Sequence, residues 1–155
     1  FGFSDVLTAF LALDTFVELY DGGTIRLSEF VNRKPDKDIL LSIIVRKSKR
    51  KFRYDSIRQT KTDFPVIACS VVTGMVHGKE TWYFSVGARP MKAGLLEKQW
   101  EIPAGASEEM IADYARQAAS EFTYGSNMRG SAEYRQHLAE VLIRREMTSI
   151  LAEGR

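Results

Sequence analysis

The sequence predicts an α+β fold in which an antiparallel sheet is followed by helices that pack on one of its faces. Two observations lead to this prediction. Alternating and β-branched segments fill the middle of the chain, and two segments with helical periodicity come after them; strands first and helices afterwards is the order expected of α+β proteins. With 155 residues, of which 45% are hydrophobic and 27% charged, the chain can bury a core.

The first expected element is a short helix. Ser4 is a candidate N-cap, and Asp5 places a carboxylate in the first turn, where the helix dipole favours negative charge. Apolar residues then cover most of the helix circumference up to Leu13, so this helix should be buried. Because natural proteins seldom open with a buried helix, we expect the chain to be the later part of a longer polypeptide.

Two strands are expected next, at residues 16–20 and 24–27, around the turn signal Asp21-Gly22-Gly23. No helix follows the two glycines to offer amide donors, so a hairpin is favoured over a phosphate-binding loop. Residues 39–45 form a continuous apolar run, typical of a strand covered on both faces. The basic run 47–51 is expected to be a solvated loop, with phosphate binding as the alternative.

The second half of the chain is predicted to hold longer strands and two helices. The strands are expected at residues 52–57, 66–73 and 81–87, the last two joined by a hairpin with Gly74 and Gly78. Ser107 and Ser131 are expected to cap the helices. The core face of the final helix is predicted to hold Tyr134, Leu138, Val141, Leu142 and Arg145. We place a domain boundary near residues 47–51.

Composition excludes several classes of function. A net charge of +2 is too small to indicate nucleic-acid binding. Cys69 stands alone in an apolar run and is expected to be a buried structural thiol, and neither His77 nor His137 has a partner at ligand spacing, so no metal site is predicted. No apolar run reaches the roughly 20 residues of a membrane span, and the opening lacks the features of a signal peptide. A cytoplasmic protein is expected.

Four segments in order carry a family resemblance: "SDVLTAFLALDTFVELYDGGTIRLSEF", "DILLSIIV", "FSVGARPMKAGLLE" and "RGSAEYRQHLAEVLIRR". They closely resemble the latter part of the FAD-binding subunit of the molybdenum hydroxylases. This family includes the medium subunit of aerobic carbon monoxide dehydrogenase and the flavin subunit of xanthine dehydrogenase. The resemblance implies that residues 1–50 are the tail of an FAD-binding α+β domain, and that residues 51–155 are the flavoprotein C-terminal α+β domain.

The resemblance also implies a cofactor and partners. In the family, this subunit receives electrons from a molybdopterin-binding subunit through a two-iron two-sulfur subunit, and its FAD passes them to an acceptor; a homodimer is a further option. The family's glycine-rich FAD loops lie mostly upstream of the position of Ser4 and Asp5, and this chain does not contain them. Such loops cradle a pyrophosphate with backbone amides, so the chain alone is expected to bind FAD weakly or not at all.

Three residues are candidates for contact with FAD, all carried by the resemblance. Asp5 matches the acidic residue that follows the second glycine-rich loop, although a first-turn helix carboxylate is an equal interpretation. Leu40 matches a position that touches the flavin. Arg58 stands where the family usually has a Lys, in an alignment that needs a one-residue gap. No catalytic acid, base or nucleophile is predicted, because redox chemistry of this kind belongs to the cofactor.

The segment "YGSNMRGSAEYR" has two interpretations. Physically, Gly125, Gly130 and the N-cap Ser131 account for a sharp helix entry. By resemblance, its helix would close the C-terminal domain and turn four arginines toward a neighbouring subunit: Arg129, Arg135, Arg144 and Arg145.

Three functions therefore compete. The first is a redox component that carries electrons through FAD, and the second is a non-catalytic docking or dimerisation domain without cofactor. The third is a ligand-binding domain with a cleft lined by Trp82, Tyr83 and Trp100, for which packing on the sheet face is the favoured alternative.

Overall fold

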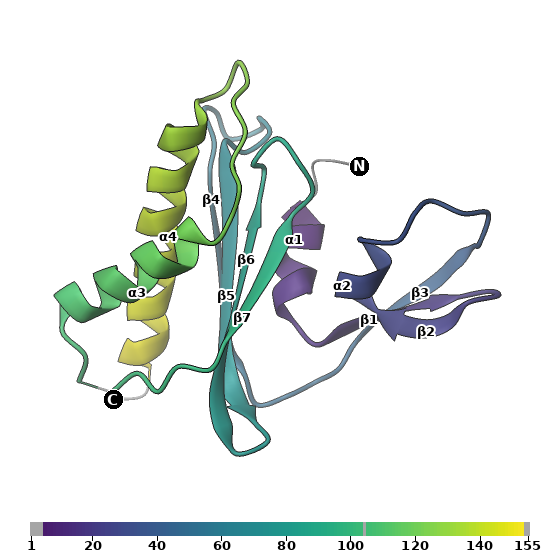
Figure 1. Ribbon diagram of the computed structural model, residues 1–155, viewed down its shortest axis with the longest axis horizontal. Helices are drawn as coiled ribbons and strands as arrows, with labels where there is room; N and C mark the ends of the chain where they lie inside the picture. The colour runs from purple at the N-terminus through teal and green to yellow at the C-terminus, as the bar shows by residue number, and fades with distance from the viewer. Residues whose placement is uncertain (1–4, 104, 154–155) are drawn as a thin grey trace.

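The strands form two separate antiparallel sheets in the computed structural model, which describes residues 5–103 and 105–153 (Figure 1). The smaller sheet has the order β2-β1-β3 and the larger one the order β4-β5-β6-β7. The smaller sheet comprises β1 (Thr15–Leu19), β2 (Gly23–Arg26) and β3 (Leu40–Val45), and the larger one β4 (Lys51–Ile57), β5 (Ile67–Val76), β6 (Lys79–Gly87) and β7 (Gly94–Lys98). The helices are α1 (Asp5–Ala12), α2 (Leu27–Phe30), α3 (Glu108–Ser120) and α4 (Ala132–Ala152). The α+β prediction is confirmed.

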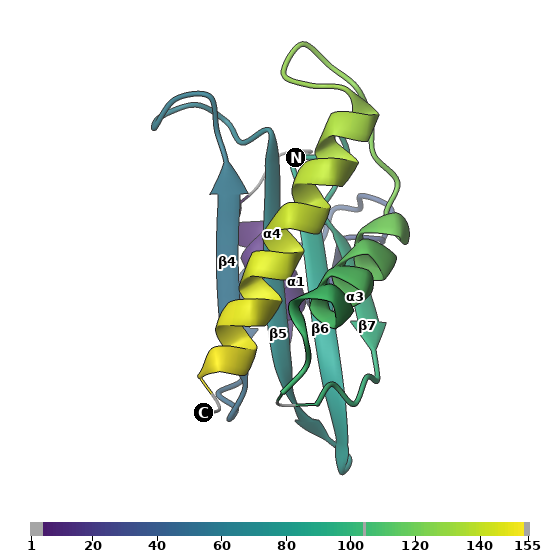
Figure 2. The ribbon, with the colours of Figure 1, turned by 90° about the vertical axis from the view of Figure 1, so that its left-hand side faces the viewer.

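Helices cover both faces of the larger sheet. Helices α3 and α4 lie side by side on one face, with α4 running across β4 and β5 (Figure 2). Helix α1 precedes the small sheet in the chain, yet it packs on the opposite face of the larger sheet against β5, β6 and β7 (Figure 1). The predicted cap Ser4 lies outside the described residues.

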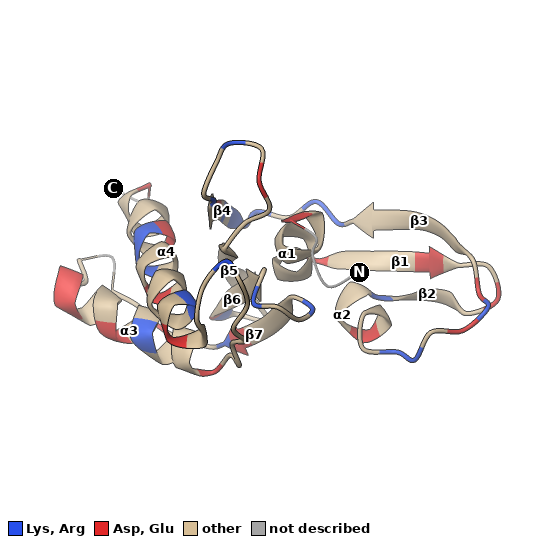
Figure 3. Cartoon of the chain, turned by 90° about the horizontal axis from the view of Figure 1, so that it is seen from above, with Lys and Arg blue, Asp and Glu red and all other residues tan. Residues whose placement is uncertain are grey.

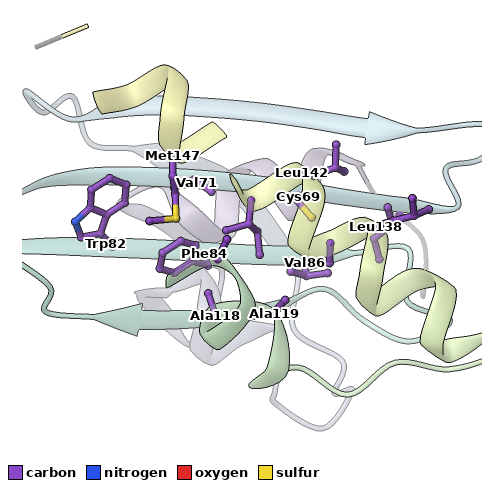
Figure 4. Close-up of a cluster of buried hydrophobic side chains, with 14 of the residues drawn as sticks. Cys69, Val71, Trp82, Phe84, Val86, Ala118, Ala119, Leu138, Leu142 and Met147 are labelled. Atoms are coloured by element: carbon purple, nitrogen blue, oxygen red, sulfur yellow. The ribbon is translucent and has the colours of Figure 1, made fainter. Parts of the chain in front are cut away.

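The main core lies between the larger sheet and helices α3 and α4 (Figure 4). Trp82 and Phe84 of β6 stack with ring centroids 6.3 Å apart, and Met147 of α4 points toward them. Trp100 joins the same aromatic cluster through contacts with Phe84 and Tyr114. The aromatic residues Trp82 and Trp100 therefore serve sheet-face packing, which is the alternative that the sequence favoured.

Both predicted hairpins form, although Gly74 lies inside β5, paired with Thr81, and only Gly78 lies in the second turn. His77 and Gly78 join β5 to β6 with φ angles of 50° and 79°, the left-handed pair that a two-residue hairpin turn requires. In the first hairpin, the carboxylate of Asp38 accepts hydrogen bonds from the amides of Asp21 (2.9 Å) and Gly22 (2.8 Å). These hydrogen bonds lower the pKa of Asp38. The turn amides of Asp21 and Gly22 therefore bind a carboxylate of their own chain.

Strand β3 lies where it was predicted but is not covered as predicted. It is an edge strand, and five of its six residues are exposed. The expected burial on both faces is wrong, because these five side chains remain exposed among the described residues.

Helix α4 begins at the predicted cap but faces inward along a different stripe. The hydroxyl oxygen of Ser131 accepts a hydrogen bond from the amide of Tyr134 (3.2 Å). The Tyr134 side chain is 49% exposed, so its prediction as a core residue is wrong, and the exposed Arg145 is likewise not in the core. The buried stripe of α4 consists of Arg135, Leu138, Ala139, Leu142, Ile143, Glu146, Met147 and Ile150.

Arg135 explains the sharp entry into α4. Its guanidinium is fully buried and donates hydrogen bonds to the carbonyl oxygens of Val66 (2.9 Å), Gly125 (2.8 Å) and Gly130, and to Oδ1 of Asn127 (2.5 Å). The loop is thus wrapped around one cation of the helix that follows it. The prediction that Arg135 faces a neighbouring subunit is wrong, because its side chain is buried and forms hydrogen bonds within the chain.

Candidate functional site

An apolar cavity of about 680 Å³ lies between α1, α2 and the small sheet. Helix α1 contributes Val6 and Phe10, β1 contributes Val17, and β3 contributes Leu40 and Ile43. The cavity also has a polar rim that is formed by Arg33, Lys34, Asp36, Asp38 and Lys92. A mostly apolar cavity of this size with a few charged groups at its edge is typical of a small-molecule or cofactor site.

A bulge in β3 brings Leu40 and Ile43 to the same cavity. In the register of β1 with β3, Glu18 pairs with Ser42 and Leu19 pairs with Leu40, so Leu41 is an extra residue on β3. Strand residues three positions apart normally point to opposite faces. The extra residue changes this alternation, and the flavin-contact candidate Leu40 therefore lies on the cavity wall.

The other two candidate residues form an ion pair with each other, and neither of them lines the cavity. Nη2 of Arg58 lies 2.5 Å from Oδ2 of Asp5, which is the neighbour of the cavity residue Val6. Arg58 also donates to the carbonyl oxygen of Asp63 (2.8 Å) and to Oγ of Ser56 (3.2 Å). The hydrogen bond to Asp5 is the main reason that the pKa of Arg58 is raised. The structure therefore brings Asp5 and Arg58 together and uses most donors of Arg58 within the chain.

Arg129, Phe64 and Tyr54 lie around this ion pair, and none of them was predicted from the sequence to belong to this site. Nη2 of Arg129 lies 3.3 Å from Oδ1 of Asp63, and the guanidinium of Arg129 also lies over the ring of Phe64. The hydroxyl of Tyr54 is buried without a hydrogen-bond partner among the described residues, and burial, followed by the charge of Asp5, raises its pKa. Arg129 thus contacts its own chain, and no sequence pattern linked these distant positions.

The chemistry of the remaining candidate groups is limited. Cys69 is buried, as predicted, and burial raises its pKa well above the usual range. Across residues 5–103 and 105–153, no cluster of His, Cys, Asp and Glu could hold a metal ion. None of the helices in this part of the chain is long and apolar enough to span a membrane.

A second, smaller cavity of about 280 Å³ lies near the junction of the two sheets. Tyr83 lines it together with Arg26, Arg50 and Asp14. Trp82 and Trp100 line neither cavity, so the three aromatic residues do not form a common cleft.

The large cavity fits one part of FAD. Its apolar wall suits the flat flavin ring, and Leu40 and Ile43 would pack against that ring. For a pyrophosphate, the cavity offers only the side chains of Arg33, Lys34 and Lys92, since the amides of Asp21 and Gly22 are bound to Asp38. The residues present therefore fit the ring and lack the amide cradle that a pyrophosphate usually receives.

Solved structures of oxidoreductases share this architecture. Quinoline 2-oxidoreductase from Pseudomonas putida 86 matches with a TM-score of 0.77 and 14% identity, over 97% of this chain and 56% of that chain. The cyanide-inactivated Cu,Mo-CO dehydrogenase matches with a TM-score of 0.71 and 19% identity, over 96% and 56% of the two chains. The CO dehydrogenase of Hydrogenophaga pseudoflava matches with a TM-score of 0.70 and 14% identity, over 96% and 59%. The chain thus spans a little over half the length of these structures.

Sequence comparison identifies the family. Residues 52–150 match the model of the CO dehydrogenase flavoprotein C-terminal domain, and the chain belongs to this family. The predicted relationship to the flavin subunits of molybdenum hydroxylases is confirmed. A search of curated proteins finds no match.

Proposed function

We propose that this chain is the C-terminal portion of the FAD-binding subunit of a molybdopterin-dependent hydroxylase or dehydrogenase. The subunit would relay electrons from iron–sulfur clusters through FAD to an acceptor. The observation that carries the proposal is the apolar cavity with Leu40 on its wall, in a chain of a flavoprotein family. The ion pair of Asp5 with Arg58 lies outside the lining of this cavity, next in sequence to the cavity residue Val6.

The residues of this chain would bind and orient the cofactor. Leu40 and Ile43 would pack against the flavin ring and exclude water from it, and Arg58 would hold the carboxylate of Asp5 in place. The buried hydroxyl of Tyr54 is a further polar group near Asp5, whose charge helps to raise the pKa of Tyr54. When bound, FAD would supply the electron-accepting and electron-donating chemistry, so the chain itself needs no acid, base or nucleophile.

The partners follow from the same proposal. A molybdopterin-binding subunit would oxidise the substrate, and a two-iron two-sulfur subunit would deliver the electrons to this flavoprotein. The related structures are of a molybdenum and copper CO dehydrogenase and of a quinoline oxidoreductase, which supports an assembly of this kind.

The test is the flavin content of the complete flavoprotein subunit, purified with and without the substitution Asp5→Asn. The complete subunit is expected to show a flavin absorption spectrum, and Asp5→Asn is expected to weaken FAD binding by about tenfold, since it removes one charged contact. Asp14→Asn is the matched control, because Asp14 forms its ion pair with Arg26 and lines only the smaller cavity.

Two outcomes would contradict the proposal or one of its parts. A colourless, flavin-free complete subunit that still binds its partner subunits would support the docking function without cofactor. Equal loss of FAD affinity in Asp5→Asn and Asp14→Asn would contradict the assignment of Asp5 to the cofactor site. The chain of 155 residues alone is expected not to bind FAD at micromolar concentration, which titration of flavin fluorescence would measure.

A further inference from the structure

The smaller cavity, of about 280 Å³, lies where the chain passes between the two sheets. Both crossings contribute to its wall, since residues 13–15 connect α1 with β1 and Arg50 precedes β4. Figure 3 shows positive charges along the second crossing, where the chain leaves β3 and turns back toward the larger sheet. The other lining residues lie on both sides of this junction and are Leu11, Arg26, Leu27, Ser28, Val76, His77, Tyr83, Leu95 and Glu97.

Arg50 brings a cation to this cavity that has no carboxylate partner among the described residues. Its guanidinium carbon lies 4.9 Å from the centroid of the Tyr83 ring. The ring attracts the cation electrostatically and accepts none of its strong hydrogen bonds, so the guanidinium keeps its donors for another acceptor. Arg50 belongs to the basic run 47–51, and Tyr83 holds this member of the run at the cavity wall.

Glu97 brings an anion to the same part of the cavity. It lies directly opposite Tyr83 in the pairing of β6 with β7, so both side chains are on the same face of the larger sheet. Burial, followed by the charge of Glu97, raises the pKa of Tyr83, while the charge of Arg50 acts in the other direction. Glu97 forms no ion pair with any described residue, Arg50 included.

The other charged side chains of the lining are already matched. Nη1 of Arg26 lies 3.4 Å from Oδ1 of Asp14. Among the described residues, the lining thus offers one arginine and one carboxylate without a partner, Arg50 and Glu97. A ligand with several negative charges would be repelled by this carboxylate, whereas a ligand that carries one charge of each sign would match both groups. The hydroxyl of Thr15, a residue of the same wall, is buried without a hydrogen-bond partner in the described part of the chain.

We propose that the smaller cavity binds a small zwitterion, namely a free α-amino acid with an aliphatic side chain. Arg50 would bind the carboxylate of this ligand, and Glu97 would bind its ammonium group. A volume of about 280 Å³ is at the lower end of the range for small-molecule sites, so it suits an amino acid better than a nucleotide. The aliphatic side chain would pack against the leucines of the lining, which are Leu11, Leu13, Leu27 and Leu95. This site is separate from the proposed flavin cavity and does not depend on the flavin function.

Ligand-observed NMR titration of the complete flavoprotein subunit tests this proposal with four probes. L-Valine carries both charges, isovalerate has the same carbon skeleton without the ammonium group, isobutylamine lacks the carboxylate, and inorganic phosphate is a multiply charged anion. L-Valine is expected to bind with a Kd on the order of 1 mM or below, and each of the other probes at least about tenfold more weakly, because each forms only one of the two charged contacts.

Two variants assign the two contacts separately. Arg50→Met is expected to weaken the binding of L-valine by about tenfold and to leave isobutylamine unchanged. Glu97→Gln is expected to weaken L-valine by about the same factor and to leave isovalerate unchanged. The matched controls are Lys49→Met and Glu101→Gln, whose residues line neither cavity, and both are expected to bind L-valine like the wild type. A variant that still binds one of the analogues has kept its fold.

Four outcomes would overturn the proposal. The first is no binding of L-valine to the wild-type subunit, and the second is binding of isovalerate or isobutylamine as tight as that of L-valine. The third is tighter binding of phosphate, which would favour the phosphate alternative for the basic run. The fourth is an equal loss of L-valine binding in Arg50→Met and Lys49→Met, or in Glu97→Gln and Glu101→Gln.

Flavin absorbance of the same samples separates this proposal from the proposed function. A colourless subunit that binds L-valine would support the zwitterion site and contradict the flavin function. A yellow subunit that does not bind L-valine would support the flavin function and contradict the zwitterion site.

Discussion

Nε of Arg135 lies 2.9 Å from the carbonyl oxygen of Val66, and this hydrogen bond joins the first turn of α4 to the start of the central strand β5. The two residues are 69 positions apart in the chain. The other donors of Arg135 hold the loop between α3 and α4 at Gly125, Asn127 and Gly130. One buried cation therefore fixes a strand, a loop and a helix relative to one another.

Replacement of Arg135 by Met should destabilise the fold strongly. The variant removes a charged donor from four acceptors, and buried acceptors without a partner are costly, so a loss of at least about 3 kcal/mol in the free energy of unfolding is expected. Urea unfolding would measure this loss. Arg144→Met is the control, since Arg144 is exposed on the same helix. Equal stability of the two variants would contradict the structural role of Arg135.

Glu146 should make stability fall as pH rises. Its carboxylate is buried on α4 without a hydrogen-bond partner among the described residues, and burial, followed by the charge of Asp55, raises its pKa to about 8. In the unfolded chain a glutamate has a pKa near 4.3. Between about pH 4.3 and pH 8, Glu146 therefore binds a proton in the folded chain but not in the unfolded chain, and stability falls as pH rises. Across this range stability should decline by up to about 1.4 kcal/mol per pH unit, with no further loss above the folded pKa.

The substitution Glu146→Gln should remove this decline, because an amide of similar size has no charge to bury. Unfolding free energies measured from pH 5 to pH 9 should then show the variant more stable than the wild type at pH 9. A wild-type protein that gains stability over the same range would contradict the assignment of Glu146 as a neutral buried acid.

Gly87 should not tolerate a side chain. A methyl group at this position would lie 1.9 Å from Oγ1 of Thr8 in α1, so Gly87→Ala should push α1 away from the larger sheet. The expected loss is about 1–3 kcal/mol, the usual cost of overpacking a core. Gly105→Ala is a suitable control, since no atom lies within 4 Å of its added methyl group. A neutral Gly87→Ala variant in thermal unfolding would mean that α1 does not lie so close to β6.

Truncation of Leu142 and of Tyr134 should have very different effects on stability, although helical periodicity places both residues on the core face of α4. Leu142→Ala should cost about 2–5 kcal/mol, because Leu142 is fully buried. Tyr134→Ala should cost less than about 1 kcal/mol, because that ring is half exposed. Denaturant unfolding of both variants would test this, and a larger loss for Tyr134 would place its ring in the core.

Local signals were predicted well from the sequence. The turns at Gly23 and Gly78 and the caps Ser107 and Ser131 depend on residues within a few positions of each other, and all four appear as expected. Strand β7 was not predicted, because its pairing with β6 follows from tertiary contacts and its five residues have little alternation.

The candidate site shows the same division between local and distant information. The cavity position of Leu40 depends on a bulge at Leu41 that no local pattern indicates. The resemblance named Asp5 and Arg58 separately, and only the fold brings their side chains into contact across 53 positions. Neighbours such as Tyr54 were missed, since an ordinary strand tyrosine gives no signal of its surroundings.

The placement of α1 has a mechanical consequence for the cavity. One wall of the cavity is α1, which is packed on the larger sheet, and the opposite wall is formed by β3 and α2, which belong to the smaller sheet. The chain crosses between these two bodies only after α1 and again at residues 46–50. A change in the angle between the two sheets would therefore change the volume of the cavity.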